Sequence, residues 1–483
     1  MTNYIYIILL YIIILMCFNF YRARKVKTQE DFMVAGRSLS MTVMVFTLVC
    51  TWIGSGTFIA GAEFSYRSGL SGLWMAVGAW FGILIIYFLA GKIRTFGQYT
   101  IGDILEVRYG KAARVFGAIA LIISFVTIVS YQLRAGGLIL NVVTDGAIPV
   151  EYGQIITAVI VIVFTATAGM MAVAYTDLPN GIIILSACVL SLPYLWRFVG
   201  GYEAVVNKLP TNYFAAVNES FGSMPYLKAG GYFLSTFLLL LGIQSMYQKF
   251  YSAKTARAAK GAVIFWIIGT IFVETVVVII AVFGASLFKS LADPATVVLT
   301  TARNAVPPVI GILLLAAACV VVLSTAMNYL LSPTTNVMRD FYQKFINPKA
   351  EQRKMVLLQK ICVVIFGIIA WFMGSQLVSV LNQAFFAYTI YGVAITPALI
   401  AALAWKRATP QGGLVSIIGG IVVTVGLRIF AVVRPDLSPE GDPFGIPLIY
   451  PAAFISIASL IIISYLTPPP SLERIRIFFP DSK

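Results

Sequence analysis

Residues 51–61 have the sequence TWIGSGTFIAG and lie within an apolar run, residues 43–62. The run is long enough to cross a membrane, yet it holds Gly54, Gly56 and several hydroxyl side chains near its middle. Glycine weakens a helix, and backbone freed within a bilayer is tolerated where it is buried or lines a polar cavity. The stretch therefore predicts either a helix broken around a binding site or a close contact between helices through small residues.

Apolar runs of similar length recur from one end of the chain to the other. Of the 483 residues, 60% are hydrophobic and 11% are charged, and the mean hydropathy is +0.91. A soluble protein this apolar would expose large patches, whereas lipid-facing helices need such a surface. We therefore predict an all-α polytopic membrane protein with about thirteen transmembrane helices. They are expected at residues 4–20, 43–62, 70–92, 114–142, 153–175, 178–199, 229–250, 261–288, 307–331, 355–377, 380–405, 411–433 and 444–466.

The basic residues indicate how these helices are oriented. The first run has no positive residue before it and is followed by Arg22 and Arg24, which is typical of an uncleaved anchor with its N-terminus outside. The alternation then predicts a cytoplasmic C-terminus in a plasma (inner) membrane protein. The formal charge of +15 follows from this topology, so nucleic-acid binding is not expected. The basic clusters on the expected cytoplasmic side are 92–94, 108–111, 249–260, 339–354, 406–407 and 474–476.

The composition argues against an enzyme. The chain has no histidine, which excludes Ser-His-Asp catalysis, Cys-His catalysis and histidine metal sites. The five cysteines are far apart and are interpreted as packing residues. The sequence shows no P-loop and no dinucleotide-binding glycine motif. Because the sequence has no such ATP-binding motif, any uphill transport of a solute by this protein would have to use an ion gradient.

A second unusual stretch, residues 321–328, has the sequence VVLSTAMN and lies in the run 307–331. The adjacent hydroxyls of Ser324 and Thr325 cannot both face lipid without cost. They could bond back to carbonyls of the preceding turn. They could instead bind a hard cation such as sodium, which prefers several oxygen ligands. These residues alone leave both interpretations open.

Three charged residues fall within predicted helices, namely Arg134, Glu274 and Arg428. Ionisable groups inside a membrane are functional candidates by default. Arg428 lies close enough to its helix end to reach water, so no function is assigned to it. Arg134 could also reach water, and Glu274 could be protonated and hydrogen-bonded within the bundle.

Taken in order, these and further stretches resemble the sodium:solute symporter family. The likeness spans essentially the whole chain. The similar stretches are DFMVAGRS (31–38), TWIGSG (51–56), YTIGDILEVRY (99–109), GMMAVAYTD (169–177), QKF (248–250), LSTA (323–326) and RDFY (339–342).

The resemblance implies a fold of the leucine-transporter type, with two inverted five-helix repeats. The repeats would span residues 43–199 and 229–405, after an extra helix and loop at 1–42 and before two helices and a short tail at 406–483. The broken helix at 50–57 would have its counterpart near residues 242–244. Such paired interruptions are the expected mark of a substrate site at the membrane midplane.

The resemblance also implies a sodium site. Asp177 would lie near the inner sodium path, at a cytoplasmic mouth where a carboxylate stays hydrated. Met327 and Asn328 stand where many family members have an acidic or hydroxyl side chain, so we expect one sodium ion rather than two. The expected ligands are the carbonyl oxygens of Cys50, Ile53 and Val321 and the hydroxyls of Ser324 and Thr325.

The chemistry of the substrate stays open. Trp52 and Tyr131 resemble aromatic cage positions of the choline-transporter branch, and cation–π contact would suit a quaternary ammonium. Arg134 favours a carboxylate instead, and a zwitterion would use both. The expected substrate-binding residues are Trp52, Gly54, Ser55, Thr57, Tyr131, Arg134 and Gln244.

The sequence therefore predicts a sodium-coupled secondary symporter that imports a small organic solute by alternating access. Its partners would be the solute, sodium and the lipid bilayer, and a monomer would be the functional unit. The alternatives are a transporter-like membrane sensor and a passive channel. The tail at 467–483 holds no kinase-like segment, and the sequence lacks a repeated filter or a ring of charges, so both alternatives are disfavoured.

Overall fold

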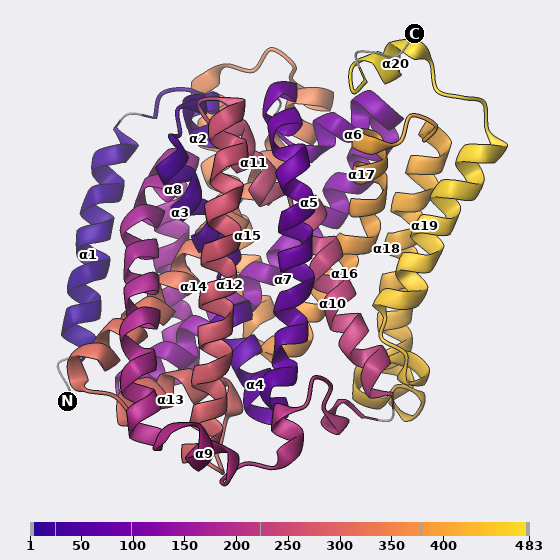
Figure 1. The fold of residues 1–483 in the computed structure, drawn as a ribbon. Coiled ribbons are helices and arrows are strands. Elements are labelled where there is room, and N and C mark those ends of the chain that lie inside the picture. Colours follow the sequence, from indigo (N-terminus) through magenta and orange to yellow (C-terminus); the bar gives the residue numbers. More distant parts are fainter. Residues whose placement is uncertain (1–3, 25, 98, 223, 377–378, 480–483) are drawn as a thin grey trace.

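The computed structural model describes residues 4–24, 26–97, 99–222, 224–376 and 379–479. Within these ranges the chain forms a bundle of helices (Figure 1), and its β-structure is an isolated bridge between Leu39 and Ala253. Twelve helices of the described chain are long and apolar enough to cross a membrane. This confirms the prediction of an all-α polytopic membrane protein.

The helices of the described ranges fall into two length groups, and the longer group is not identical with the twelve candidate spans, because it includes the 12-residue helix α3 and because α8 contains two spans. The long ones are α1 (Tyr4–Ala23), α3 (Met41–Trp52), α5 (Trp74–Phe96), α7 (Lys111–Val143), α8 (Val150–Val199), α10 (Pro225–Gly242), α12 (Ala256–Leu287), α14 (Pro308–Asn336), α15 (Gln352–Ser375), α16 (Val380–Ala394), α18 (Pro410–Val433) and α19 (Ile449–Leu466). The short ones are α2 (Gln29–Val34), α4 (Ala62–Ser68), α6 (Ile101–Tyr109), α9 (Gly201–Val206), α11 (Gln244–Ser252), α13 (Val297–Asn304), α17 (Thr396–Ala404) and α20 (Leu472–Arg476).

Large apolar side chains cover the outside of the bundle. Phe88, Ile268 and Val422 are more than half exposed on α5, α12 and α18. Lipid tails solvate such side chains well, whereas water does not. The exposed apolar surface is therefore the one that a bilayer requires.

Two helices are interrupted in the middle of the bundle. α3 ends at Trp52 because Ile53 has extended backbone, and the chain resumes as the π-helical segment η2 (Gly56–Gly61), followed by α4. α10 ends at Gly242 in the same way, because Ile243 is extended and α11 begins at the next residue. A Cβ at Gly242 would lie 2.2 Å from Thr396 Oγ1, so a larger residue does not fit this break. Since α3 has only 12 residues, it is too short to be counted as a membrane span. The described chain therefore has twelve candidate spans, whereas the sequence predicts about thirteen.

The position of one predicted turn is wrong. The spans at 153–175 and 178–199 place it near residue 176, whereas the structure places it at Gly169 within α8. Gly169 has a φ of +56°, and a Cβ there would lie 2.6 Å from the carbonyl oxygen of Phe32. Only glycine tolerates this geometry. Apolar residues continue on both sides of the turn, so hydropathy does not locate it, and Asp177 consequently lies within a helix.

Ion pairs close the end of the bundle that carries α2, α6 and α20, here called the C-terminal side (Figure 1). Arg114 lies 2.7 Å from Asp103 and 2.6 Å from Asp340, and it also contacts Glu106. Burial alone would raise the pKa of Glu106, but hydrogen bonds from Lys344 and Arg114 hold that pKa below its usual value. These charges join α6, the start of α7 and the π-helical segment η7 (Val337–Ile346).

The opposite end of the bundle carries α4, α9 and α13 (Figure 1). A hollow at this end is lined by residues of α4, α7 and α10, among others. We call this hollow the vestibule. Aromatic residues lie between the vestibule and the centre of the bundle, because Tyr232 packs on both Phe64 and Phe385, and Phe385 packs on Tyr388. The charged residues of the vestibule are Glu63, Arg67, Arg134, Lys228, Asp293, Arg428 and Asp442.

Candidate functional site

Oxygen atoms from three helices meet where α3 ends. Thr325 Oγ1 on α14 lies 3.1 Å from the carbonyl oxygen of Cys50 and 3.0 Å from that of Ile53. Ser324 Oγ contacts the carboxylate of Asp177 on α8 and lies 3.5 Å from the Cys50 carbonyl oxygen. Carbonyls at a helix end lack partners within the helix, so α3 presents them to α14. We call this group the oxygen cluster.

The oxygen cluster suits a hard monovalent cation. It offers two hydroxyls, two backbone carbonyls and a carboxylate, and each of these residues is at most 2% exposed. The hydroxyl of Thr325 points to another helix rather than back to its own preceding turn, so the back-bonding alternative does not describe it. Val321 is fully buried one turn before Thr325 on the same helix. The structure thus brings four of the predicted sodium ligands, Cys50, Ile53, Ser324 and Thr325, to one place.

Asp177 lies deeper than predicted. Its side chain is fully buried, one oxygen contacts Ser324, and the other accepts a hydrogen bond from Thr47 Oγ1 at 2.5 Å. Asn328 Nδ2 lies 3.4 Å from the same oxygen. The prediction of a hydrated cytoplasmic mouth is wrong because the turn is at Gly169, which places Asp177 about two helical turns into the bundle.

A buried lysine extends this network. The sequence assigned Lys249 to a cytoplasmic basic cluster, but the structure buries it completely on α11. Its Nζ contacts Asn328 Oδ1 and lies 3.9 Å from Met170 Sδ. The signal in the sequence is a charge at the very end of the predicted span 229–250, where a lysine is also compatible with the beginning of a cytoplasmic loop.

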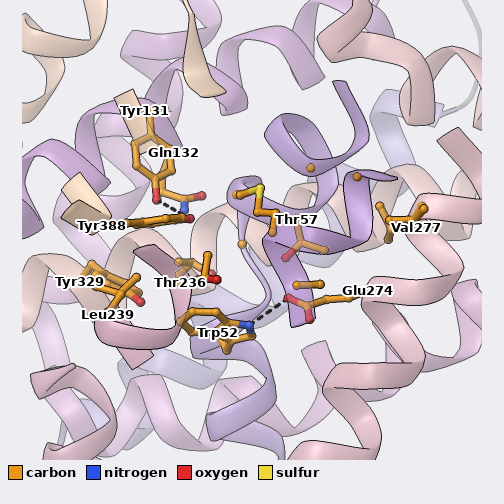
Figure 2. Close-up of a pocket in the computed structure, with 18 residues that line it drawn as sticks. Trp52, Thr57, Tyr131, Gln132, Thr236, Leu239, Glu274, Val277, Tyr329 and Tyr388 are labelled. Carbon is orange, nitrogen blue, oxygen red and sulfur yellow. Dashed lines mark hydrogen bonds between the residues drawn. The ribbon is translucent and has the colours of Figure 1, made fainter. Parts of the chain in front are cut away.

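A central cavity lies beside the oxygen cluster, and Figure 2 shows its lining. Thr325 borders both the cluster and the cavity. Four predicted substrate-binding residues line the cavity, namely Trp52, Gly54, Thr57 and Tyr131. Gln132, Tyr329 and Tyr388, which were not predicted, also line the cavity. Glu274, whose role the sequence leaves open, lines it as well.

The glycines of the interrupted segment let other helices approach its backbone. A Cβ at Gly54 would lie 2.8 Å from Gln132 Nε2 and 2.9 Å from Thr325 Oγ1. A Cβ at Gly56 would lie 2.4 Å from the Tyr388 hydroxyl. The backbone N–H of Ser55 donates to Gln132 Oε1 at 3.0 Å. Backbone therefore forms one wall of the cavity.

We expect Gly54→Ala to weaken sodium binding by roughly tenfold or more, since the added methyl group would displace the Thr325 hydroxyl from the oxygen cluster. The measurement is the sodium-dependent rise in the melting temperature of the purified protein. Gly91→Ala on α5 is the matched control, because a Cβ there meets nothing within 4 Å. Wild-type sodium affinity in Gly54→Ala would contradict the close approach.

Three predicted substrate-binding residues, Arg134, Gln244 and Ser55, are not among the residues that line the cavity. Arg134 borders the vestibule, 3.5 Å from Glu151. Gln244 is fully buried and bonds toward the C-terminal side, where its Oε1 accepts from Ile101 N at 3.1 Å and from Asn336 Nδ2 at 3.2 Å. Repeat symmetry relates the two backbone breaks but does not specify where the side chains beside them point. The assignments of Arg134 and Gln244 are therefore corrected.

Ser55 also differs from its prediction. Its hydroxyl is buried and has no hydrogen-bond partner in the described part of the chain, and Ser55 is not among the residues that line the cavity. Its contribution to the site is the backbone N–H bond to Gln132.

Residues 32–420, which include the interrupted helix and the hydroxyl pair that it faces, match the model of the sodium:solute symporter family. The chain belongs to the sodium:solute symporter family. Among its relatives, the osmoregulated proline transporter OpuE of Bacillus subtilis is 24% identical over 97% of this chain and 96% of its own. A sodium/proline symporter of Staphylococcus aureus is 26% identical over 96% of this chain and 92% of its own.

Solved structures show the same fold as this symporter. A Na⁺-coupled sialic acid symporter in a substrate-bound outward-open state has a TM-score of 0.80 at 16% identity, covering 98% of this chain and 99% of its own. Mhp1, a nucleobase-cation-symport-1 family transporter, has a TM-score of 0.59 at 14% identity, covering 92% and 97%. The predicted leucine-transporter type of fold is confirmed. The predicted function, sodium-coupled symport of a small solute, is confirmed by the family.

Proposed function

We propose that this symporter imports one small organic solute together with one sodium ion. The sodium ion binds in the oxygen cluster, and the solute binds in the central cavity. The observation that carries the proposal is the position of Thr325, which borders both sites. Sodium held by Thr325 and the carbonyls of Cys50 and Ile53 would fix the interrupted segment. Because that segment is a wall of the cavity, each ligand stabilises the site of the other, and this coupling is reciprocal.

A single sodium ion is supported by Lys249. Its buried ammonium contacts Asn328, whose amide lies 3.4 Å from Asp177. This fixed positive charge already offsets the negative charge of the Asp177 carboxylate, so no excess negative charge remains in the oxygen cluster to hold a second cation beside the first. Asp177 would then be a transient ligand, within the bundle, for the sodium ion as it arrives or departs.

We also propose where the protein is located and how it is oriented in the membrane. The protein lies in the plasma (inner) membrane with its N-terminus outside and its C-terminus in the cytoplasm, because the basic clusters gather on the C-terminal side. The vestibule then faces outward, and the ion pairs around Arg114 close the cytoplasmic side. We also propose a monomer as the functional unit.

The repeat boundaries are part of the same proposal. The two inverted repeats span residues 43–199 and 229–405, with residues 1–42 and 406–483 outside them. They are supported by the two interruptions after Trp52 and Gly242, where extended residues follow in both cases. Inverted repeats that move against each other around such breaks provide alternating access.

Uptake into reconstituted vesicles tests the function. L-proline is the first solute to try because two relatives are proline transporters, and a zwitterionic, a quaternary-ammonium and a carboxylate solute complete the panel. We expect an inward sodium gradient to concentrate at least one of these solutes, with a Hill coefficient for sodium near one. Equal uptake with and without the gradient would contradict symport, and a coefficient near two would contradict the single ion.

A further inference from the structure

The central cavity contains a carboxylate that the proposed sodium site does not use. Among the described residues that line the cavity, Glu274 is the only one with a charged side chain. It lies near the middle of α12 and is 5% exposed. An ionisable group at this depth is costly to keep, so it calls for a functional explanation.

Two tryptophans hold the carboxylate of Glu274 in place. Trp52 Nε1 donates to Oε1 at 2.9 Å, as Figure 2 shows, and Trp80 Nε1 donates to Oε2 at 2.6 Å. Indole is a donor only, so each carboxylate oxygen receives a hydrogen bond from a neutral group. This arrangement suits a carboxylate that accepts at both oxygens, and no basic side chain lines the described cavity to neutralise it.

We propose that the transported solute carries a cationic nitrogen, as a protonated or quaternary amine, and that Glu274 is its counter-charge. This inference rests on the proposed function, because it places the solute in the central cavity. A buried carboxylate without an opposite charge is unfavourable, and a cationic solute supplies that charge when it binds. Solutes that carry only a negative charge meet like charge there and are rejected.

The aromatic lining supports a cationic solute independently. Trp52, Tyr131, Tyr329 and Tyr388 all line the cavity, and Figure 2 shows them around the same space as Glu274. Aromatic faces attract ammonium groups, most strongly where water is excluded. Arg134, the cation that would hold a carboxylate, borders the vestibule instead.

Matched ligands test the inference on the wild-type protein. At saturating sodium, calorimetry would compare L-proline with tetrahydrofuran-2-carboxylate, in which an oxygen replaces the ring nitrogen. Glycine betaine and choline add two fixed cations, and lactate adds an anion without nitrogen. We expect at least one of the three nitrogen compounds to bind, and the two nitrogen-free anions to bind at least about tenfold more weakly or not at all.

Variants then assign the effect to Glu274. Glu274→Gln keeps the size of the side chain, and we expect it to bind the best nitrogen compound about 10- to 100-fold more weakly. Glu274→Asp keeps the charge and should recover part of the affinity. Glu63→Gln is the matched control, because Glu63 is a similarly buried acid that borders the vestibule and should leave binding within about twofold.

The sodium-dependent melting temperature separates the possible failures. We expect sodium alone to stabilise wild type and Glu274→Gln equally. Three results would each overturn the inference. A nitrogen-free anion could bind as tightly as the best nitrogen compound, none of the three nitrogen compounds could bind, or Glu274→Gln could keep the wild-type affinity. The comparison of ligands on the wild-type protein tests the inference even if a variant does not fold. A wild-type protein that sodium does not stabilise would contradict the proposed function, and the inference with it.

Discussion

Replacing Ser324 and Thr325 together by alanine is expected to raise the sodium concentration needed for half-maximal stabilisation by about 100-fold or more. The double variant removes both hydroxyls from the oxygen cluster and leaves the carbonyls of Cys50 and Ile53 without partners on α14. A cation there would have too few oxygen ligands in apolar surroundings. Sodium-dependent thermal stabilisation measures the effect directly, without knowledge of the solute.

The control for this variant is Thr334→Ala. Thr334 is also buried on α14, but its hydroxyl bonds to the carbonyl oxygen of Leu331, 2.7 Å away on its own helix. Losing that bond should cost some stability and leave sodium affinity unchanged. If the double variant kept wild-type sodium affinity while Thr334→Ala behaved as expected, the oxygen cluster would not be the sodium site.

Asp177→Asn is expected to lower both stability and sodium affinity. The amide keeps the shape of the side chain, but it removes the negative charge beside Ser324 and leaves the buried Lys249 without a nearby anion. Breaking a buried pair in direct contact costs about 3–5 kcal/mol. We expect on the order of 2 kcal/mol here, because the amide of Asn328 lies between the two charges. Equilibrium unfolding and sodium titration measure the two effects separately.

A double variant separates the two roles of Asp177. Adding Lys249→Met to Asp177→Asn removes the unpaired ammonium, so most of the lost stability should return. Sodium affinity should stay low, since the carboxylate is still missing. A double variant no more stable than Asp177→Asn would show that Lys249 and Asp177 are not coupled.

Much of the architecture was predictable from the sequence, because lipid imposes a simple condition on every segment that crosses it. Each span must be apolar over about 20 residues, and the runs between residues 4 and 466 satisfy this one by one. The interruption at Gly54 and Gly56 and the hydroxyls of Ser324 and Thr325 were visible for the opposite reason. They break the apolar pattern locally, so they are detected without knowledge of any partner.

Other features depended on which helices pack together. The chain turns at Gly169, where a positive φ and the contact with Phe32, far away in the sequence, leave no room for a side chain, and the place of this turn decides the depth of Asp177. Glu274 accepts a hydrogen bond from Trp52, 222 residues away, and this points it into the cavity. Hydropathy reflects the free energy of transferring a whole segment into lipid, averaged over all faces of that segment. The face that a single side chain presents is decided only when distant helices pack against it.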